Sequence, residues 1–173
     1  KKDLEYYAKK IGADYIKTTK VHTKEFIDFA SKHDLIFSVA ASAIFKESLI
    51  KAPKFGIVNI HSGPIPNYRG MMPVFWQMRD GKKEIGITIH FINEKIDSGK
   101  ILVQKFVDIS HINTLDEAIR YTKREGAKMV IDFLNNFENY LKNQREVQEE
   151  GSYFSFPTRK DVVEFKRKGY KLV

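Results

Sequence analysis

Cysteine is absent from the 173 residues of this chain. Disulfides, thiolate zinc sites, iron–sulfur clusters and cysteine nucleophiles are therefore excluded. No apolar run approaches the ~20 residues that a membrane-spanning helix needs, so we expect no membrane partner. The sequence also lacks a signal peptide at its start and a Gly-x-Gly-x-x-Gly motif after any expected strand, which excludes a dinucleotide-binding dehydrogenase. A chain without cysteine suits a reducing compartment, and we expect a cytoplasmic protein.

The residues that are present have the composition of an ordinary globular domain. Hydrophobic residues make up 42% of the chain and aromatic residues 13%, which is too many for a disordered protein. Lys and Arg outnumber Asp and Glu by 30 to 22, giving a formal charge of +8. Such a charge favours anionic partners such as nucleic acid, nucleotides or phosphorylated sugars, although a solvated lysine-rich surface explains it without any partner.

Apolar runs typical of buried strands alternate with segments of helical periodicity along most of the chain. The predicted strands cover residues 14–18, 35–40, 57–61, 85–92 and 101–109. The predicted helices cover residues 4–11, 23–30, 71–79 and 114–141, with a short one around 49–50. This alternation predicts an α/β, Rossmann-like fold with a mostly parallel, twisted sheet flanked by helices.

The chain opens with a predicted helix, whereas a doubly wound α/β domain normally opens with a strand. We therefore expect that the first strand–helix–strand segment is missing from this sequence. Residues 1–150 are predicted to form one N-terminally incomplete domain, and residues 151–173 a basic, aromatic C-terminal tail.

Three polar residues fall where predicted strands end, which is where α/β proteins place their chemistry. Asn59 and His61 close the strand at 57–61, and Asp97 follows the strand at 85–92. Asn59 and His61 are two positions apart on an extended strand, so their side chains point to the same side. A carboxylate can fix the tautomer of an imidazole, and an amide can stabilise an oxyanion. Each residue alone has an ordinary structural explanation, but the three together indicate a catalytic site.

Four short sequences occur in the order and spacing of one protein family. They are Asn59-x-His61, Pro66-x-x-Arg69-Gly70, Gly86-x-Thr88 and Asp97-x-Gly99. In these motifs the chain resembles the folate-dependent formyltransferases, which include glycinamide ribonucleotide, methionyl-tRNA and sugar-nucleotide N-formyltransferases. The resemblance extends from about residue 34 to residue 104. It implies the formyltransferase version of the Rossmann-like fold, with residues 1–150 as its catalytic domain.

The resemblance also implies a reaction that needs no metal. N10-formyltetrahydrofolate gives its formyl group to a primary amine, which attacks the formyl carbon. Asn59 and a protonated His61 are expected to hydrogen-bond the oxygen of the tetrahedral intermediate. Asp97 is expected to hold His61 and to relay the proton, directly or through water.

The resemblance further implies where the two substrates bind. The formyl donor is expected to contact two loops and a bordering histidine, which together comprise Ser42, Ala43, Ile44, Phe45, His90, Asn93, Glu94, Lys95 and Ile96. The acceptor is expected along the loop after the catalytic histidine, on Ser62, Gly63, Pro64, Arg69 and Gly70. Core packing explains Ile44 and Phe45 equally well, bracing of the loop explains Arg69, and His90 can instead face solvent.

The sequence departs from the family pattern in two places. The family's Ser-Leu-Leu-Pro is Ser-Gly-Pro-Ile-Pro at residues 62–66, where Pro64 removes a backbone donor, and Lys95 replaces a common glycine. Phe75 and Trp76 resemble the sugar-formylating members, so we expect an amino-sugar nucleotide or a similar small anionic amine as acceptor. Methionyl-tRNA and glycinamide ribonucleotide stay open as acceptors. A formyltetrahydrofolate hydrolase, a basic nucleic-acid-binding module and a homodimer stay open as well.

Overall fold

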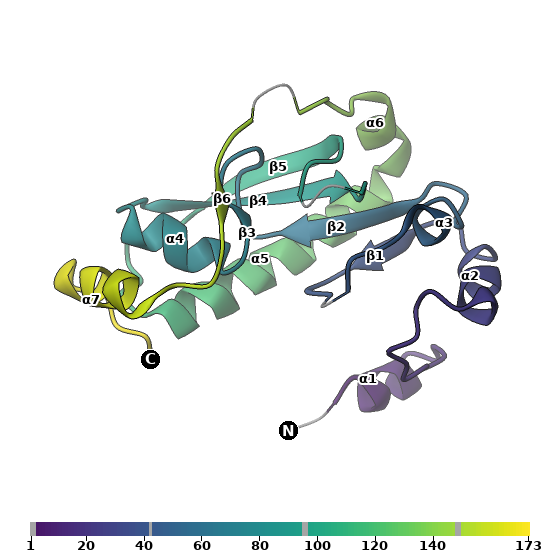
Figure 1. Cartoon of the computed structure of the whole chain (residues 1–173), viewed down its shortest axis with the longest axis horizontal. Coiled ribbons are helices and arrows are strands. Elements are labelled where there is room, and N and C mark those ends of the chain that lie inside the picture. The colour runs from purple at the N-terminus through teal and green to yellow at the C-terminus, as the bar shows by residue number, and fades with distance from the viewer. Residues whose placement is uncertain (1–2, 42, 95–96, 148–149) are drawn as a thin grey trace.

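The structure is a computed structural model, and it describes residues 3–41, 43–94, 97–147 and 150–173. The helices are α1 (Leu4–Lys10), α2 (Lys24–Ala30), α3 (Glu47–Ile50), α4 (Pro73–Arg79), α5 (Leu115–Asn135), α6 (Phe137–Lys142) and α7 (Arg159–Arg167). The strands are β1 (Ile36–Ser38), β2 (Ile57–His61), β3 (Arg69–Gly70), β4 (Glu84–Phe91), β5 (Ile101–Asp108) and β6 (Tyr153–Phe154). Figure 1 shows a sheet with the long helix α5 along one side, α4 and α7 at one end, and α2 and α3 at the other.

The main sheet has the strand order β1-β2-β4-β5, and the predicted α/β fold with helices flanking a sheet is confirmed. In detail the described strands pair in a mixed way. β1 and β2 are parallel, whereas β2–β4 and β4–β5 are antiparallel, where the sequence analysis expected mostly parallel pairing. The physical reason for the β4–β5 pair is its short connection over residues 92–100, because a parallel pair needs a crossover of about a dozen residues or more.

Alternation along β2 and β4 divides the sheet into an apolar face and a polar face. The apolar face packs against α5, in a cluster that includes Val58, Ile87, Ile89, Met129 and Phe133. α5 approaches this face closely at Gly126, where an added Cβ would lie 2.9 Å from the side chain of Ile60. The opposite face presents Asn59, His61, Thr88 and His90, which are neighbours because Asn59 pairs with His90 and His61 with Thr88.

The long helix predicted over 114–141 is divided at Asn136 into α5 and α6. The backbone N–H of Asn136 still donates to the carbonyls of Asp132 and Phe133, but Asn136 has φ −121° and ψ 26°, which lies outside the helical region and interrupts the helix there. At the other end, Thr114 caps α5 as predicted, because its hydroxyl accepts a hydrogen bond from the backbone N–H of Glu117 at 3.3 Å.

Residues 151–173 supply β6 and α7, and both elements pack against the body of the protein. Phe165 of α7 is completely buried, and its ring stacks on that of Phe75 in α4 with centroids 4.8 Å apart. α7 begins with a reciprocal capping box between Thr158 and Asp161. Phe154, Phe165 and Tyr170 of this segment therefore belong to the same apolar cluster as α4 and the start of α5.

The N-terminal residues make few contacts. α1 has no buried residue and lies apart from the sheet in Figure 1. The strand predicted over residues 14–18 is not formed, since these residues are exposed and pair with no strand of the described chain. Among the described helices, none combines the length and the apolar character required to cross a membrane.

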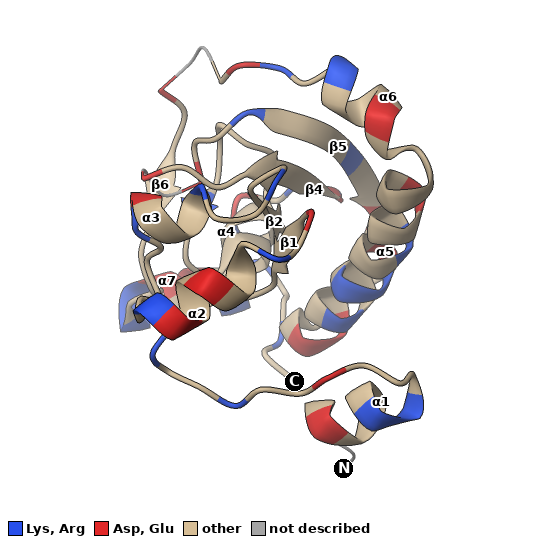
Figure 2. Cartoon of the chain, turned by 90° about the vertical axis from the view of Figure 1, so that its right-hand side faces the viewer, with Lys and Arg blue, Asp and Glu red and all other residues tan. Residues whose placement is uncertain are grey.

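Positive charge is distributed over the surface. Figure 2 shows Lys and Arg interspersed with Asp and Glu on α1, α2 and α5. Several of these charges are paired along one helix, as in Arg120–Asp116 and Lys128–Glu125 of α5. This distribution fits the solvated-surface explanation of the +8 charge.

The burial of Phe165 predicts how strongly α7 contributes to stability. Replacing this fully buried ring in Phe165→Ala should lower the free energy of unfolding by about 3–5 kcal/mol, because apolar contacts are lost and a cavity remains. Urea denaturation measures the change. Phe156→Ala in the same segment is the matched control: Phe156 is 63% exposed, and its loss should change stability by about 0.5 kcal/mol or less. Equal effects of the two substitutions would contradict the burial of α7.

Candidate active site

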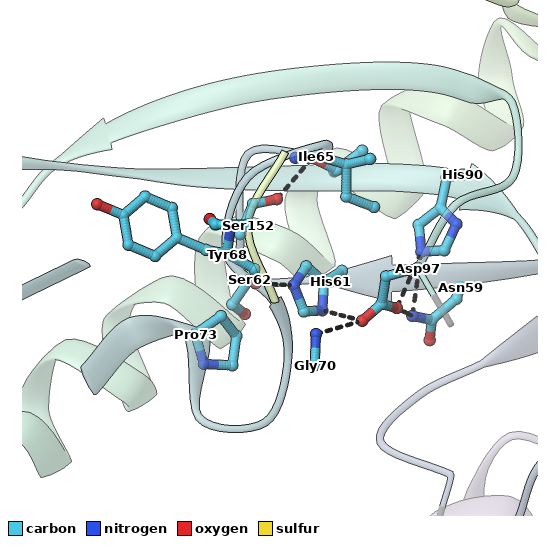
Figure 3. A network of polar contacts seen from close by, with 12 residues as sticks. Asn59, His61, Ser62, Ile65, Tyr68, Gly70, Pro73, His90, Asp97 and Ser152 are labelled. Atoms are coloured by element: carbon cyan, nitrogen blue, oxygen red, sulfur yellow. Dashed lines mark hydrogen bonds and ion pairs between the residues drawn. The ribbon is translucent and has the colours of Figure 1, made fainter. Parts of the chain in front are cut away.

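Four side chains from two adjacent strands and the loop that follows them converge at one place. Asn59 and His61 come from β2, His90 comes from β4, and Asp97 comes from the loop after β4 (Figure 3). The antiparallel register places Asn59 opposite His90, and the loop returns Asp97 to the same face of the sheet. The three residues predicted to be catalytic therefore lie together.

The carboxylate of Asp97 is the centre of this cluster. Its Oδ2 accepts a hydrogen bond from the backbone N–H of Gly70 at 2.9 Å and lies 3.6 Å from Nδ1 of His61. Its Oδ1 lies 3.6 Å from Nε2 of His90 and 3.5 Å from Nδ2 of Asn59. Burial alone would raise the pKa of Asp97, but the contact with His90, the charge of His61 and the Gly70 N–H together hold the pKa below its usual value.

His61 is buried, with 7% of its surface exposed, and both ring nitrogens face acceptors. Its Nε2 lies 2.8 Å from the carbonyl oxygen of Tyr68, so Nε2 must carry a proton. Burial lowers the pKa of His61 more than Asp97 and the Tyr68 carbonyl raise it. The resting imidazole is therefore neutral near pH 7, with the unprotonated Nδ1 directed at Asp97. The lowered pKa of His61 therefore differs from the protonated resting His61 that the resemblance implies.

His90 fixes the orientation of Asn59. Its Nδ1 lies 2.9 Å from the carbonyl oxygen of Phe91, which can only accept, so Nδ1 is a donor, and Nε2 faces both the Asn59 amide and Asp97. Nδ2 of Asn59 lies 3.3 Å from that Nε2 and 3.5 Å from Asp97. The amide nitrogen therefore faces the cluster. At 3.5 Å the contact with Asp97 is long for a hydrogen bond, so this N–H can turn to another acceptor.

The loop after β2 is held in place by the buried polar side chains of Gln77 and Thr88. Gln77 of α4 donates to the carbonyl of Ser62 at 2.8 Å and accepts from the N–H of Gly86 at 2.9 Å. The hydroxyl of Thr88 donates to the carbonyl of Gly63 at 2.7 Å. These carbonyls are thus occupied within the protein.

The same loop packs tightly against His61 and the sheet. A Cβ at Gly63 would lie 2.7 Å from Nε2 of His61, and Pro64 packs directly on Gly86. The sequence analysis did not predict the contact of Gln77 with this loop. The one feature that could have indicated it is an amide side chain within the mostly apolar α4, and in the structure Gln77 is 1% exposed.

A cavity of about 890 Å³ is lined by residues next in sequence to Asp97 and Gly70, although Asn59, His61, His90 and Asp97 are not themselves among its lining residues. Its walls come from α3, β3, the loop before Asp97 and the segment around β6, and they include Glu47, Lys51, Arg69, Asn93, Glu94, Ser98, Glu150 and Tyr153. Arg69, predicted to bind the acceptor, and Asn93 and Glu94, predicted to bind the donor, all line this cavity. The guanidinium of Arg69 donates to the carbonyl oxygen of Glu150 at 2.7 Å, so it is partly anchored.

Comparison with known proteins identifies the family. The family model described as formyl transferase matches residues 8–134. The chain belongs to the formyl transferase family. Methionyl-tRNA formyltransferase of Geobacillus sp. (strain WCH70) is 34% identical over 125 residues, which are 71% of this chain and 39% of that protein. The chain thus spans about two fifths of the length of this curated relative.

Solved structures share the fold of this family member. A sugar N-formyltransferase from Shewanella sp. FDAARGOS_354 superposes with a TM-score of 0.69 at 24% identity, covering 93% of this chain and 69% of that one. An N-formyltransferase from Helicobacter canadensis, solved in complex with folinic acid and dTDP-3-aminofucose, gives a TM-score of 0.63 at 23% identity and covers 92% and 55%. These likenesses show the shared fold.

The other loop predicted to bind the donor in this formyl transferase lies between β1 and α3. Ala43 and Ile44 are exposed, and Ile44 is 71% exposed, while the carbonyl of Ile44 lies 3.0 Å from Nε2 of His22. Phe45 is half-buried and packs with the cluster of Leu49. Ser42, Lys95 and Ile96, also predicted to bind the donor, lie outside the described residues.

The lowered pKa of His61 predicts a pH dependence of stability. In the unfolded chain His61 has its ordinary pKa of 6.5, whereas in the folded protein its pKa is lower. As the pH drops from about 7.5 to about 5.5, the unfolded state therefore binds a proton more readily than the folded state, and the free energy of unfolding should fall. His61→Gln should lose part of this dependence, as measured by urea denaturation at both pH values. His111→Gln, which replaces an exposed histidine, should retain it. The same pH dependence in His61→Gln and the unsubstituted protein would contradict the assignment.

Proposed function

We propose that this chain catalyses transfer of a formyl group from N10-formyltetrahydrofolate to a primary amine. The observation that supports this most strongly is the convergence of Asn59, His61 and Asp97 on one buried cluster in a member of the formyl transferase family. An amide donor, an imidazole and a carboxylate are the groups that acyl transfer to an amine needs.

The reaction follows from the state of these groups. The amine nitrogen bonds to the formyl carbon, and the C=O π electrons move to the oxygen. This oxygen accepts a hydrogen bond from the side-chain N–H of Asn59. The former amine nitrogen releases a proton to Nδ1 of His61, directly or through water, and Asp97, 3.6 Å away, stabilises the imidazolium. The bond to N10 then breaks, N10 takes the proton from His61, and tetrahydrofolate and the formamide leave. His61 returns to its neutral form.

A folate donor is supported by the ligand of a structural relative and by the walls beside the cluster. The Helicobacter canadensis protein was solved with folinic acid, a formylated folate. In this chain Ala43 and Ile44 are exposed apolar residues, and the polar residues Asn93 and Glu94 line the cavity, so both kinds of surface that a pteridine needs are accessible. The flat ring suits an apolar wall, and backbone groups can read its polar edge.

We infer that the acceptor is a small anionic amine, with an amino-sugar nucleotide as the first candidate. The cavity of about 890 Å³ has room for a nucleotide-sized molecule, and Arg69 on its wall can pair with a phosphate. The two structural relatives act on sugars, by their names or ligands. A second candidate is methionyl-tRNA, which is favoured by the 34% identity to the Geobacillus enzyme.

Asp97→Asn tests the catalytic assignment. Formyl transfer should fall roughly 10²–10⁴-fold, because the neutral amide cannot stabilise a charged His61. Turnover is measured by the mass increase of the acceptor. Binding of the donor should persist, which a thermal shift with folinic acid checks. Asp34→Asn, at a side chain that is 79% exposed, is the control and should be fully active. Turnover near that of the unsubstituted protein would remove Asp97 from the mechanism.

A panel of acceptors tests the choice of substrate. The protein and the formyl donor are incubated with amino-sugar nucleotides, glycinamide ribonucleotide, charged initiator tRNA or no amine. We expect a formyl mass increase on an amino-sugar nucleotide and little formate release without amine. Exclusive formylation of the tRNA would favour the second candidate. Rapid formate release without amine would instead indicate a hydrolase, and salt-sensitive RNA binding without folate binding a nucleic-acid-binding module.

A further inference from the structure

We propose that the segment at residues 150–155, which we call the C-terminal strap, positions the catalytic pair of His61 and Asp97, and that Ser152 is the residue through which it does so. The inference rests on the proposed formyl transfer for its kinetic test only. Figure 1 shows the strap crossing the sheet beside β3 on its way to α7. The strap lies more than fifty residues beyond Asp97 in the sequence, and no motif connects it to the site.

The pair is held by the backbone of a single short stretch, residues 68–71. The carbonyl oxygen of Tyr68 accepts from Nε2 of His61 at 2.8 Å, and the N–H of Gly70 donates to Asp97 at 2.9 Å. These two are the shortest contacts that either catalytic side chain makes with its described partners. The relative position of the imidazole and the carboxylate therefore depends on where this stretch lies.

The strap fixes that stretch on both sides. The hydroxyl of Ser152 accepts from the N–H of Tyr68 at 2.9 Å, and the carbonyl of Ser152 accepts from the N–H of Arg69 at 3.0 Å. The carbonyl of Phe154 accepts from the N–H of Met71 at 2.8 Å. Figure 3 shows Ser152 next to Tyr68, with His61 on the other side of Tyr68. Ser152 thus holds the peptide groups on either side of the Tyr68 Cα.

The backbone of this stretch needs such support. Tyr68 has φ +57°, which is unfavourable for a residue with a side chain and persists only where the surroundings fix it. Stacking adds to the hydrogen bonds, because the ring of Phe154 lies between those of Tyr68 and Trp76, with centroids 5.5 Å and 4.7 Å away. Gly70, with φ +91°, allows the close pairing, since a Cβ there would collide with the carbonyl of Phe154.

The experiment compares Ser152→Ala with Ser155→Ala, a substitution at an exposed serine of the same strap. Steady-state kinetics of formyl transfer give kcat and KM, and NMR follows the pH titration of the His61 ring in both variants. Ser152→Ala should lower kcat roughly threefold to tenfold, the effect of one lost hydrogen bond, with KM for the donor unchanged. Its His61 should titrate at lower pH, because the Tyr68 carbonyl that raises the pKa is less well placed. Ser155→Ala should match the unsubstituted protein in both measurements.

Two results would overturn the inference. One is the same kcat and the same His61 titration in both variants. The other is a rise in KM with kcat unchanged, which would mean that Ser152 affects binding and leaves the catalytic pair in place. If the unsubstituted protein transfers no formyl group to any acceptor, the proposed function fails, and the His61 titration still decides whether the strap positions the pair. Gly70→Ala is a second variant, whose added Cβ would separate β3 from β6. In this variant too, His61 should titrate at a lower pH than in the unsubstituted protein.

Discussion

The structure of the site depends on one buried carboxylate. Asp97 is 12% exposed, and a carboxylate that is this far removed from water must be compensated by polar groups within the protein. Three separate parts of the chain surround it: the Asn59 amide and the His61 ring of β2, His90 of β4, and the backbone N–H of Gly70, which is the closest donor. Because each of these parts is needed to satisfy one carboxylate, the loop after β2, the loop after β4 and the sheet must take up a single arrangement.

Strand alternation lets one sheet supply both the apolar core and the polar face that carries the candidate site. Odd and even positions of β2 and β4 face opposite sides, so Val58, Ile87 and Ile89 pack on α5 while Asn59 and His90 face the cluster. A shift of the β2–β4 pairing by one residue would separate Asn59 from His90 and expose the apolar side chains. The hydrophobic effect that fixes the register therefore also fixes the geometry of the catalytic groups.

Local rules of sequence predicted the parts of the site that lie on strands. The spacing of Asn59 and His61 gave their shared face, whereas the sequence left His90 open between the site and solvent, because its register against β2 is not a local property. The α/β class followed from the alternation of elements. The antiparallel direction of β4 was not predicted, because apolar runs show burial and not strand direction. The contact between Tyr68 and Ser152 joins residues 84 positions apart, and no local pattern specifies such a pairing.

The difference between strand and loop residues also separates the side-chain cluster from the cavity. Asn59, His61 and His90 are held by the sheet, whose register is fixed by the core. The cavity is walled by α3, by loops and by the strap, with Glu150 and Tyr153 on either side of Ser152. Loops carry fewer packing constraints than a core strand, so the walls that α3 and the loop after β4 supply can change without moving Asn59 or His61. Since the strap both lines the cavity and holds Tyr68, an acceptor that contacts Tyr153 would bear on the segment that places the catalytic pair. Binding of the correct amine and alignment of His61 with Asp97 would then be linked through the two-residue pairing of β3 with β6.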